Sequence, residues 1–279
     1  LHGREHSFPT RRSSDLTALD NNPALVRGPY LHIATSTSMV VKWRTDVACP
    51  SRVNFGPAPG TLTSFTDDPA STFDHEVTVT GLQPATTYFY SIGTPSATLA
   101  GGDVNTFFTT SPLPGAQAPL RIWVTGDHGT PNDDQRRVRD AYLAHVGGNT
   151  AQAWLWLGDN AYQSGTMHEF QYCTFKDMYE PVLRQTVAWP APGNHDYYVG
   201  ADAATNTGPY YDLFAAPKNG QAGGVPSNTE AYYSYDIGNV HFVSLDSYGS
   251  PRSPTGAMAT WLTNDLALAR NRSEWIVAY

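Results

Sequence analysis

The sequence predicts two domains in succession, an all-β sandwich followed by an α/β domain. Between residues 27 and 110, short strand-like segments are separated by turns about every ten positions, which is the spacing of a small sandwich. After residue 120, apolar segments alternate with helical patterns, which predicts parallel strands joined by helices. The stretch 111–119 has Pro at three positions and no apolar periodicity, so it is predicted to be a linker.

The strands of the first domain are short. In the segment 39–44, Met39, Val41 and Trp43 occupy every second position, so one face is expected to be buried and the other solvated. Further strands are expected at 51–55, 76–80 and 87–92.

The second domain is predicted to begin with three parallel strands, at 120–125, 153–157 and 186–191. A helix capped by Asn132 or Asp133 follows the first strand, and its buried face is expected to comprise Val138, Ala141, Tyr142 and Val146. Another helix is expected over 169–184.

The remainder of the second domain is predicted to continue the α/β pattern. The segment 197–230 is rich in loop residues and is expected to form one wall of the functional site. A β-hairpin over 232–235 and 240–245, a helix over 258–269 and the start of a strand at 275–279 complete the pattern.

Each of the three parallel strands is followed by glycine and then by a residue with a side-chain oxygen. The motifs are Gly126-Asp127-His128-Gly129, Gly158-Asp159-Asn160-Ala161-Tyr162 and Gly193-Asn194-His195-Asp196. The oxygen donors are 32 and 35 residues apart, so crossover helices would bring them to one sheet edge, where α/β folds place ligand sites. Carboxylate and amide oxygens bind hard cations, and the motifs therefore predict a metal site.

A pair of ions about 3.5–4 Å apart needs a bridging ligand, because the two cations repel each other strongly. Asp159, in the middle motif, is the predicted bridge, while Asp127 would bind one ion and Asn194 the other through its amide oxygen. Tyr162 could return to the first ion as a phenolate. A phenolate is costly at neutral pH unless a highly charged cation stabilises it, which favours Fe(III) at that position.

Composition excludes some classes of function. The net charge of −8 argues against a nucleic-acid-binding protein, which normally carries a basic face, although bound cations would still attract a phosphate. No apolar run approaches the ~20 residues that span a bilayer. Cys49 and Cys173 are expected to be unpaired thiols, because they fall in different predicted domains.

Two resemblances follow from these residues. Leu82-x-Pro84-x-Thr86-x-Tyr88 resembles the tyrosine-corner signature of fibronectin type III domains, and Trp43 lies where such domains bury a Trp. The resemblance implies a fibronectin type III-like sandwich over residues 27–110. Such a domain could be a binding module, but a structural role is favoured because no exposed aromatic stripe or basic patch stands out.

The three glycine motifs resemble those of the metallophosphoesterase superfamily and, within it, the purple acid phosphatases. The family pattern is GDxG, GDxxY and GNH[ED], then VxxH and GHxH, and this chain has GDHG, GDNAY and GNHD. Gly129 stands where many other superfamily members have a ligand His, whereas Tyr162 is present, which is the purple-type exchange. The resemblance covers residues 27–279 and implies a calcineurin-like catalytic domain over 120–279, part of a β-sandwich flanked by helices.

The resemblance also implies how far the ligand set extends. Val277-Ala278-Tyr279 resembles the start of VxxH, so the sequence is expected to be a fragment that lacks the last three His ligands and binds the ion pair weakly or not at all. For the full-length protein it implies Fe(III) plus a divalent Fe, Zn or Mn ion. A metal-bound hydroxide would hydrolyse a small phosphomonoester. Asn194 and His195 would contact the substrate, and His195 could protonate the leaving alkoxide.

Other functions remain open at this point. A phosphodiesterase or nucleotidase would use the same metals, and a non-catalytic surface adhesion or binding protein would keep the scaffold without the chemistry. The resemblance implies a secreted, cell-surface or periplasmic protein, and the oligomeric state is not predicted.

Residues 1–16 are set apart from the fold. His6 to Leu16 back-translate in one reading frame to a string that resembles a common sequencing-adapter oligonucleotide, so the segment is expected to be an artefact. The alternative is a basic, disordered leader.

Several polar residues outside the ligand set are expected to have ordinary roles. His241 is expected to be a satisfied core histidine and Asp246 a turn residue or a residue behind the site. Packing is expected for Tyr210 and Tyr211, and a solvated helix start for His168 and Glu169. His128 is left open between the pocket, solvent and a backbone hydrogen bond.

Overall fold

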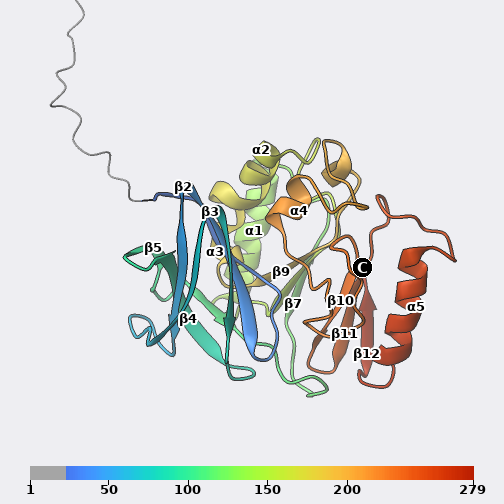
Figure 1. Cartoon of the computed structure of the whole chain (residues 1–279), viewed down its shortest axis with the longest axis horizontal. Helices are drawn as coiled ribbons and strands as arrows, with labels where there is room; N and C mark the ends of the chain where they lie inside the picture. Colours follow the sequence, from blue (N-terminus) through green and yellow to red (C-terminus); the bar gives the residue numbers. More distant parts are fainter. Residues whose placement is uncertain (1–22) are drawn as a thin grey trace, which may run out of the picture.

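The computed structural model describes residues 23–279 and shows a β-rich N-terminal domain packed against an α/β domain (Figure 1). The segment 1–16, predicted to be an artefact, lies outside the described residues. The N-terminal domain consists of β1 (Leu25–His32), β2 (Ser38–Gly56), β3 (Ser64–Thr80), β4 (Thr87–Thr94), β5 (Ala97–Gly101) and β6 (Phe107–Thr109).

β2 and β3 form a long antiparallel hairpin that two groups of strands share. β1 pairs with the first part of β2, whereas β4 pairs with its last part, from Arg52 to Gly56. Register breaks on either side of Cys49 interrupt the pairing of β2 with β3, and such irregularities bend a strand. The strands predicted separately at 39–44 and 51–55 are therefore two halves of one strand.

Of the two aromatic residues that the sequence singles out in this domain, Trp43 lies in the interior and Tyr88 is half-buried. Trp43 is fully buried and stacks on His75, with 4.7 Å between ring centroids. The Tyr88 hydroxyl accepts a hydrogen bond from the Gln83 backbone amide at 3.0 Å, so it ties the turn before β4 to that strand.

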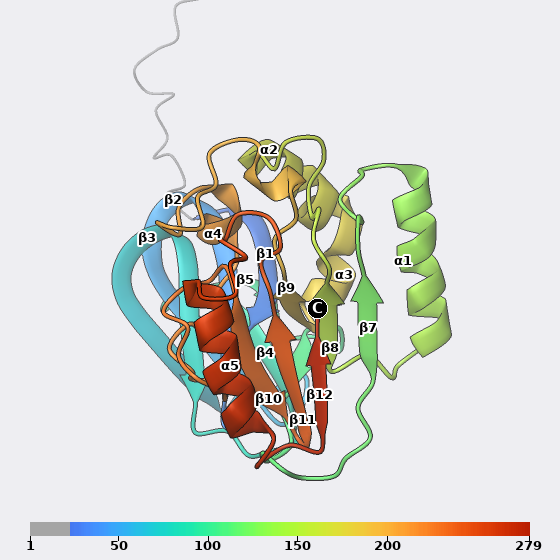
Figure 2. The same cartoon turned by 90° about the vertical axis from the view of Figure 1, so that its right-hand side faces the viewer.

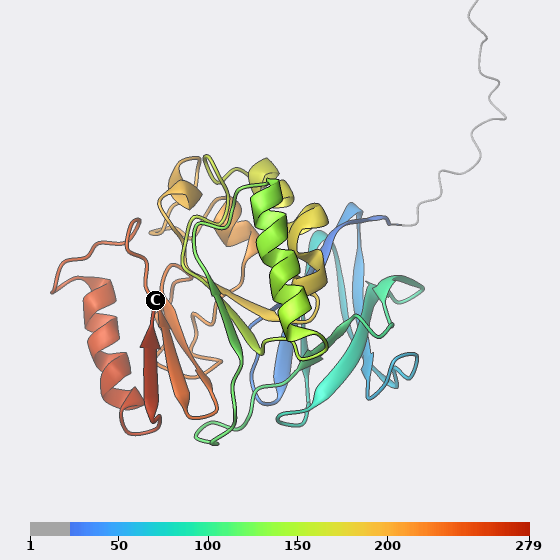
Figure 3. The same cartoon turned by 180° about the vertical axis from the view of Figure 1, so that it is seen from behind.

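The α/β domain contains two three-stranded sheets. β7 (Ile122–Thr125), β8 (Ala153–Trp156) and β9 (Val187–Pro190) are parallel neighbours in that order. β10 (Tyr233–Ile237) and β11 (Val240–Ser244) form the predicted hairpin, and β12 (Trp275–Ala278) pairs in parallel with β11. The helices α1 (Asp133–Val146) and α5 (Ala257–Ala269) lie on opposite sides of the sheets (Figure 2 and Figure 3).

Helix α1 is capped as predicted, but only half of its predicted buried face is covered: Val146 is buried and Tyr142 is half-buried against Trp123. The Asn132 side chain accepts a hydrogen bond from the Gln135 amide at 3.0 Å. Val138 is 54% exposed and Ala141 is also exposed, whereas Gln135 is buried. The side-chain nitrogen Nε2 of Gln135 donates to the Cys173 carbonyl at 2.7 Å, which accounts for its burial. The local sequence does not reveal this partner.

The helix predicted over 169–184 is divided. It consists of α2 (Met167–Phe170), a π-helical segment η2 (Gln171–Tyr179) and α3 (Glu180–Leu183). Lys176 and Asp177 leave helical geometry, and Asp177 has a positive φ of 57°. Arg139 donates to the carbonyls of Asp177 and Met178 at 2.8 and 2.6 Å, which satisfies backbone oxygens that the break releases.

Most of the face of segment 39–44 that was predicted to be solvated is buried, because the α/β domain covers it, whereas Arg44 stays partly exposed. Val40 and Lys42 are 4% and 6% exposed. Beside them, the Tyr30 hydroxyl donates to the Leu213 carbonyl at 3.2 Å, and His32 Nδ1 lies 3.1 Å from the Ala188 carbonyl. The alternation in sequence shows which residues share a face, but not whether a second domain packs on it.

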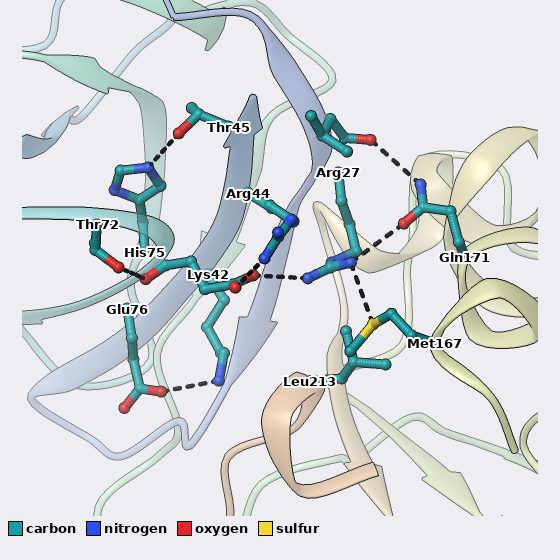
Figure 4. Close-up of polar contacts among 12 residues, drawn as sticks. Arg27, Lys42, Arg44, Thr45, Thr72, His75, Glu76, Met167, Gln171 and Leu213 are labelled. Atoms are coloured by element: carbon teal, nitrogen blue, oxygen red, sulfur yellow. Dashed lines mark hydrogen bonds and ion pairs between the residues drawn. The ribbon is translucent and has the colours of Figure 1, made fainter. Parts of the chain in front are cut away.

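The charged groups at this interface are compensated. Lys42 pairs with Glu76 at 2.9 Å (Figure 4). Burial, together with the charge on Lys42, lowers the pKa of His32 to about 3, so His32 is neutral and donates from Nδ1 to Ala188. The interface therefore buries a neutral imidazole and a paired cation, as low-dielectric surroundings require.

Two further expectations concern cysteine and the membrane. Cys49 and Cys173 are unpaired, as predicted, and both are buried. Across residues 23–279, no helix combines the length and the apolar character that crossing a membrane requires.

His241 is a satisfied core histidine, as predicted. It is fully buried in β11, with Nδ1 2.6 Å from Asp236 and Nε2 2.8 Å from Asp265. Burial lowers the pKa of His241, but the hydrogen bonds and charges of the two carboxylates outweigh that effect and raise the pKa to about 9.

We expect the free energy of unfolding to fall as pH rises from about 6.5 to about 9, by roughly 3 kcal/mol from this residue. Folded His241 keeps its proton up to about pH 9, whereas the unfolded chain releases it near 6.5. The contribution is therefore complete below about pH 6.5 and lost above about pH 9. Denaturant titrations across this range measure the slope. His241→Gln should remove this residue's contribution to the pH dependence of the free energy of unfolding. An unchanged slope in that variant would contradict the assignment.

Candidate metal centre

The three glycine motifs meet at one edge of the β7–β8–β9 sheet. Thr125, Trp156 and Pro190 are aligned across the three parallel strands, so the chain leaves all three at the same level. Pairing continues one residue further, because the Leu157 amide donates to the Thr125 carbonyl at 2.8 Å and the Ala191 amide to the Trp156 carbonyl at 2.9 Å. The convergence predicted from the motif spacing is confirmed.

The loops after β7 and β8 turn sharply at the two aspartates. Asp127 and Asp159 both have a φ of 53°, in the left-handed region that few non-glycine residues adopt. This conformation costs on the order of 1–3 kcal/mol and persists where surrounding structure enforces it. Here the Asp127 amide donates to the Gly158 carbonyl at 3.1 Å, so one loop holds the other.

Glycine is required where these loops touch. A Cβ added to Gly129 would collide with the backbone of Asn160 and Ala161. A Cβ added to Gly193 would collide with the amide nitrogen and a carboxylate oxygen of Asp159. The absence of side chains lets the third loop approach the second at backbone contact distance.

Tyr162 joins the carboxylates of the first two motifs. Its hydroxyl oxygen lies 2.7 Å from Asp127 Oδ1 and 2.9 Å from Asp159 Oδ2. The other oxygen of Asp159 accepts a hydrogen bond from the His195 amide at 3.0 Å. The structure therefore brings Asp127, Asp159 and Tyr162 into direct contact and places the backbone of the third motif beside them.

Asn194 and His195 lie next to this group. The Asn194 amide nitrogen donates to the Tyr198 hydroxyl at 2.6 Å, which leaves its amide oxygen for another partner. The His195 ring lies 4.5 Å from the Tyr162 ring, and its Nδ1 is 2.6 Å from the Gln163 carbonyl. With Nδ1 donating to this carbonyl, Nε2 remains for a ligand. Both side chains are half-buried, so the site is open to solvent.

The donor set fits a hard cation. Tyr162 has one hydroxyl proton for two carboxylates, so three oxygens crowd together with too few protons to pair them all. Burial, followed by the two carboxylates, raises the pKa of Tyr162 above its ordinary value. A cation would supply the missing positive charge. Asp127, Asp159 and Tyr162 could hold one ion, and Asp159 and Asn194 are the described residues that could hold a second.

The set depends on tyrosine and asparagine as well as on aspartate. Within residues 23–279, no group of three or more His, Cys, Asp or Glu side chains is arranged to hold a metal ion. The first ion's proposed ligands include only two residues of those types, and the phenol completes the set.

Asp196 is a structural residue of the site that the sequence reasoning missed. It is fully buried and accepts hydrogen bonds from the Gly193 amide at 2.7 Å and from both nitrogens of Asn160 at 2.9–3.0 Å. Burial raises the pKa of Asp196 to about 7, and the backbone hydrogen bonds oppose that rise. Asp196 therefore joins the second motif to the third. The position of Asp196 inside the third motif was the feature of the sequence that could have indicated this role.

Glu169 does more than begin a helix. Its carboxylate accepts hydrogen bonds from the Gln163 and Ser164 amides at 2.7 and 3.1 Å, and it forms a capping box with Thr166. It therefore holds the loop that follows Tyr162. His168 is exposed, as predicted for a solvated helix start.

The remaining residues near the site are packed. His128 is buried among Trp154, Trp156 and Tyr179, and burial lowers its pKa to about 3, so it does not line a pocket. Its partner is the hydroxyl of Thr125, at 3.3 Å.

The predictions for Asp246, Tyr210 and Tyr211 are confirmed. Asp246 is fully buried in a turn, where it accepts hydrogen bonds from the Tyr248 and Gly249 amides and from the Tyr197 hydroxyl. Tyr210 and Tyr211 are buried, and the Tyr210 hydroxyl donates to the Pro190 carbonyl at 2.8 Å.

Family models match both domains. Residues 27–110 match the purple acid phosphatase N-terminal domain, and residues 120–279, more than half of the chain, match the calcineurin-like phosphoesterases. The chain belongs to the calcineurin-like phosphoesterase family. Its resemblance to purple acid phosphatases, inferred from the three glycine motifs, is confirmed.

Named relatives of this phosphoesterase agree with the family model. Purple acid phosphatase 23 of Arabidopsis thaliana is 29% identical over 228 residues, which cover 73% of this chain and 47% of the relative. Acid phosphatase type 7 of Mus musculus is 28% identical over 271 residues, which cover 86% of this chain and 54% of the relative. This phosphoesterase chain spans about half the length of these curated relatives.

A solved structure shows the same fold. The structure of PhoD aligns with this phosphoesterase at a TM-score of 0.62 and 14% identity, covering 89% of this chain and 60% of that chain. At this identity the likeness concerns the fold alone.

We expect Gly193→Ala to lower the free energy of unfolding by about 2 kcal/mol or more, because the added methyl group must displace the Asp159 backbone or carboxylate. Gly148→Ala is the matched control, since its Cβ would meet nothing within 4 Å, and it should stay within about 0.5 kcal/mol of wild type. Urea titrations measure both values. Equal stability of the two variants would show that the second and third loops are not in contact as described.

Proposed function

We propose that the protein hydrolyses small phosphomonoesters at a two-metal centre held by Asp127, Asp159, Tyr162 and Asn194. The observation that carries this proposal is the contact of one phenol oxygen with two carboxylates at the converging strand ends. The family membership supports a phosphoesterase, and the relatives named purple acid phosphatase and acid phosphatase favour monoesters.

The proposed assignment of ligands follows the chemistry of the donors. Asp127 and Tyr162 would bind Fe(III), Asp159 would bridge the ions, and Asn194 would bind a divalent Fe, Zn or Mn ion. When bound, such ions activate water and stabilise negative charge on phosphoryl oxygens. The loop contacts hold these side chains in place before any ion arrives.

His195 is the proposed catalytic residue. The contact of its Nδ1 with the Gln163 carbonyl orients the imidazole, and the hydrogen bond from its backbone amide to Asp159 fixes the main chain. The free Nε2 would contact the phosphate or donate a proton to the leaving alkoxide. Asn194 would contact the substrate as well.

We also propose the finer organisation of the chain. Residues 27–110 would be a fibronectin type III-like domain with a structural role, residues 111–119 a linker, and residues 120–279 catalytic. The tie between Tyr88 and Gln83 and the burial of Trp43 support this reading of the first domain. Export to the cell surface, periplasm or medium is part of the same proposal.

The substrate class is tested with the complete gene product. We expect faster hydrolysis of p-nitrophenyl phosphate than of bis(p-nitrophenyl) phosphate. Preference for the bis-ester would instead indicate a phosphodiesterase. If the metal-loaded protein hydrolyses neither ester, a non-catalytic protein is favoured.

We expect His195→Asn to lower kcat with p-nitrophenyl phosphate by roughly 100-fold or more, since general acid catalysis contributes on that order. Metal content should stay unchanged, because His195 is not a proposed ligand. His168→Asn removes an exposed imidazole from the same region and should stay within about twofold of wild type. Equal rates in the two variants would remove His195 from the mechanism.

We expect Tyr162→Phe to abolish the visible tyrosine–Fe(III) charge-transfer absorption of the iron-loaded complete gene product. The ring is retained, but the oxygen that lies between Asp127 and Asp159 is lost. Tyr172→Phe, at a position 43% exposed on η2, serves as the control and should keep the band. Persistence of the band in Tyr162→Phe would assign the iron to another residue.

A further inference from the structure

The helical segment 167–183 lies between the candidate metal centre and the N-terminal domain. On the side of the site, Glu169 accepts hydrogen bonds from the Gln163 and Ser164 amides, and the Thr174 hydroxyl donates to the Asn160 carbonyl at 3.2 Å. Asn160 directly follows Asp159, and Gln163 directly follows Tyr162. The segment therefore determines where the loop of the second motif sits.

The other side of this segment contacts β1 of the N-terminal domain. The Arg27 guanidinium donates to Gln171 Oε1 at 3.2 Å and to Met167 Sδ at 3.9 Å (Figure 4). The same group lies 5.2 Å from the centroid of the Phe175 ring. Gln171 in turn donates to the Val26 carbonyl at 3.2 Å, so the contact is reciprocal.

Arg27 is itself held firmly. Its side chain is 2% exposed, and its Nη2 pairs with Asp74 of β3 at 2.8 Å. Burial makes this cation dependent on its partners, because an unpaired buried charge is strongly unfavourable. Arg44 pairs with the same carboxylate and is 37% exposed, but within residues 23–279 it makes no hydrogen bond to segment 167–183.

We propose that Arg27 is a positioning residue through which the N-terminal domain fixes the Asp159–Tyr162 loop. Arg27 contacts Met167, Gln171 and Phe175. Within the same segment, Thr174 holds the loop backbone at Asn160, and Glu169 holds the chain directly after Tyr162. The role in catalysis rests on the proposed function, whereas the mechanical link does not. The N-terminal domain thereby acts on the site without contributing a ligand.

The link is tested by amide hydrogen exchange in the metal-free complete gene product. In Arg27→Met, which keeps an apolar stem beside Phe175, we expect amides of residues 160–166 to exchange roughly tenfold faster, as loss of charge-assisted hydrogen bonds allows local opening. Arg44→Met should leave these amides within about twofold of wild type. Unchanged exchange at 160–166 in Arg27→Met would overturn the proposal.

A second variant covers the case in which Arg27→Met does not fold. Gln171→Met breaks the same contact from the helical side, at a half-buried position, and should also speed exchange at 160–166. If exchange increases only in β1 and not at 160–166, the interface is merely structural and the proposal fails.

The catalytic consequence is measured separately. If the proposed function holds, Arg27→Met should lower kcat for p-nitrophenyl phosphate about tenfold, with KM changed by less than about twofold, and Arg27→Lys should recover part of kcat. Increased exchange in a protein without phosphatase activity would sustain the link and reject the proposed function. An unchanged kcat in an active enzyme with increased exchange would overturn the positioning role.

Discussion

The parallel, aligned pairing of β7, β8 and β9 is the constraint on which the candidate site depends. Because the three strands end at the same level, the residues that follow them meet at one edge without any long-range adjustment. The left-handed turns at Asp127 and Asp159 then redirect the chain within a single residue. Gly129 and Gly193 allow the resulting loops to touch, and the side chains of Asp127, Asp159 and Tyr162 therefore lie in contact.

The electrostatics of this edge favour a cation. Two carboxylates and a phenol share one hydroxyl proton, and the surrounding contacts keep them from moving apart. Asp196 connects the second and third loops from the buried side, and Glu169 holds the stretch after Tyr162. Asp196 and Glu169 thus hold the loops without using the side chains of the proposed metal ligands, which is how a site becomes preorganised for an ion.

Much of this arrangement was predictable from the sequence, because the information was local. The repeated order of strand, glycine and oxygen donor predicted that the motifs of Asp127, Asp159 and Asn194 meet at one sheet edge, and Tyr162 was placed with them from its position three residues after Asp159. The hairpin, β12 and the cap at Asn132 likewise depend on neighbouring residues. Because β7, β8 and β9 are neighbours in the order in which they occur in the sequence, consecutive motifs also lie next to each other in the structure.

The features that were not predicted depend on partners far away in the sequence. The sequence does not show that the polar side of segment 39–44 packs against the second domain. Nor does it show that Val138, which has the spacing of a core residue, is exposed on α1. Nor does the sequence around Asp196 show that Asn160 will supply two of its donors. In each case a contact across tens of residues decides the burial, and the local pattern is compatible with either outcome.

Anomalous X-ray diffraction from crystals of the complete gene product, grown with iron and zinc, tests the central claim most directly. The account predicts two anomalous peaks at the ends of β7, β8 and β9, one of them about 2.0–2.2 Å from oxygens of Asp127, Asp159 and Tyr162. Peaks located elsewhere in a folded protein, or carboxylates of Asp127 and Asp159 directed to opposite sides of the sheet, would contradict it.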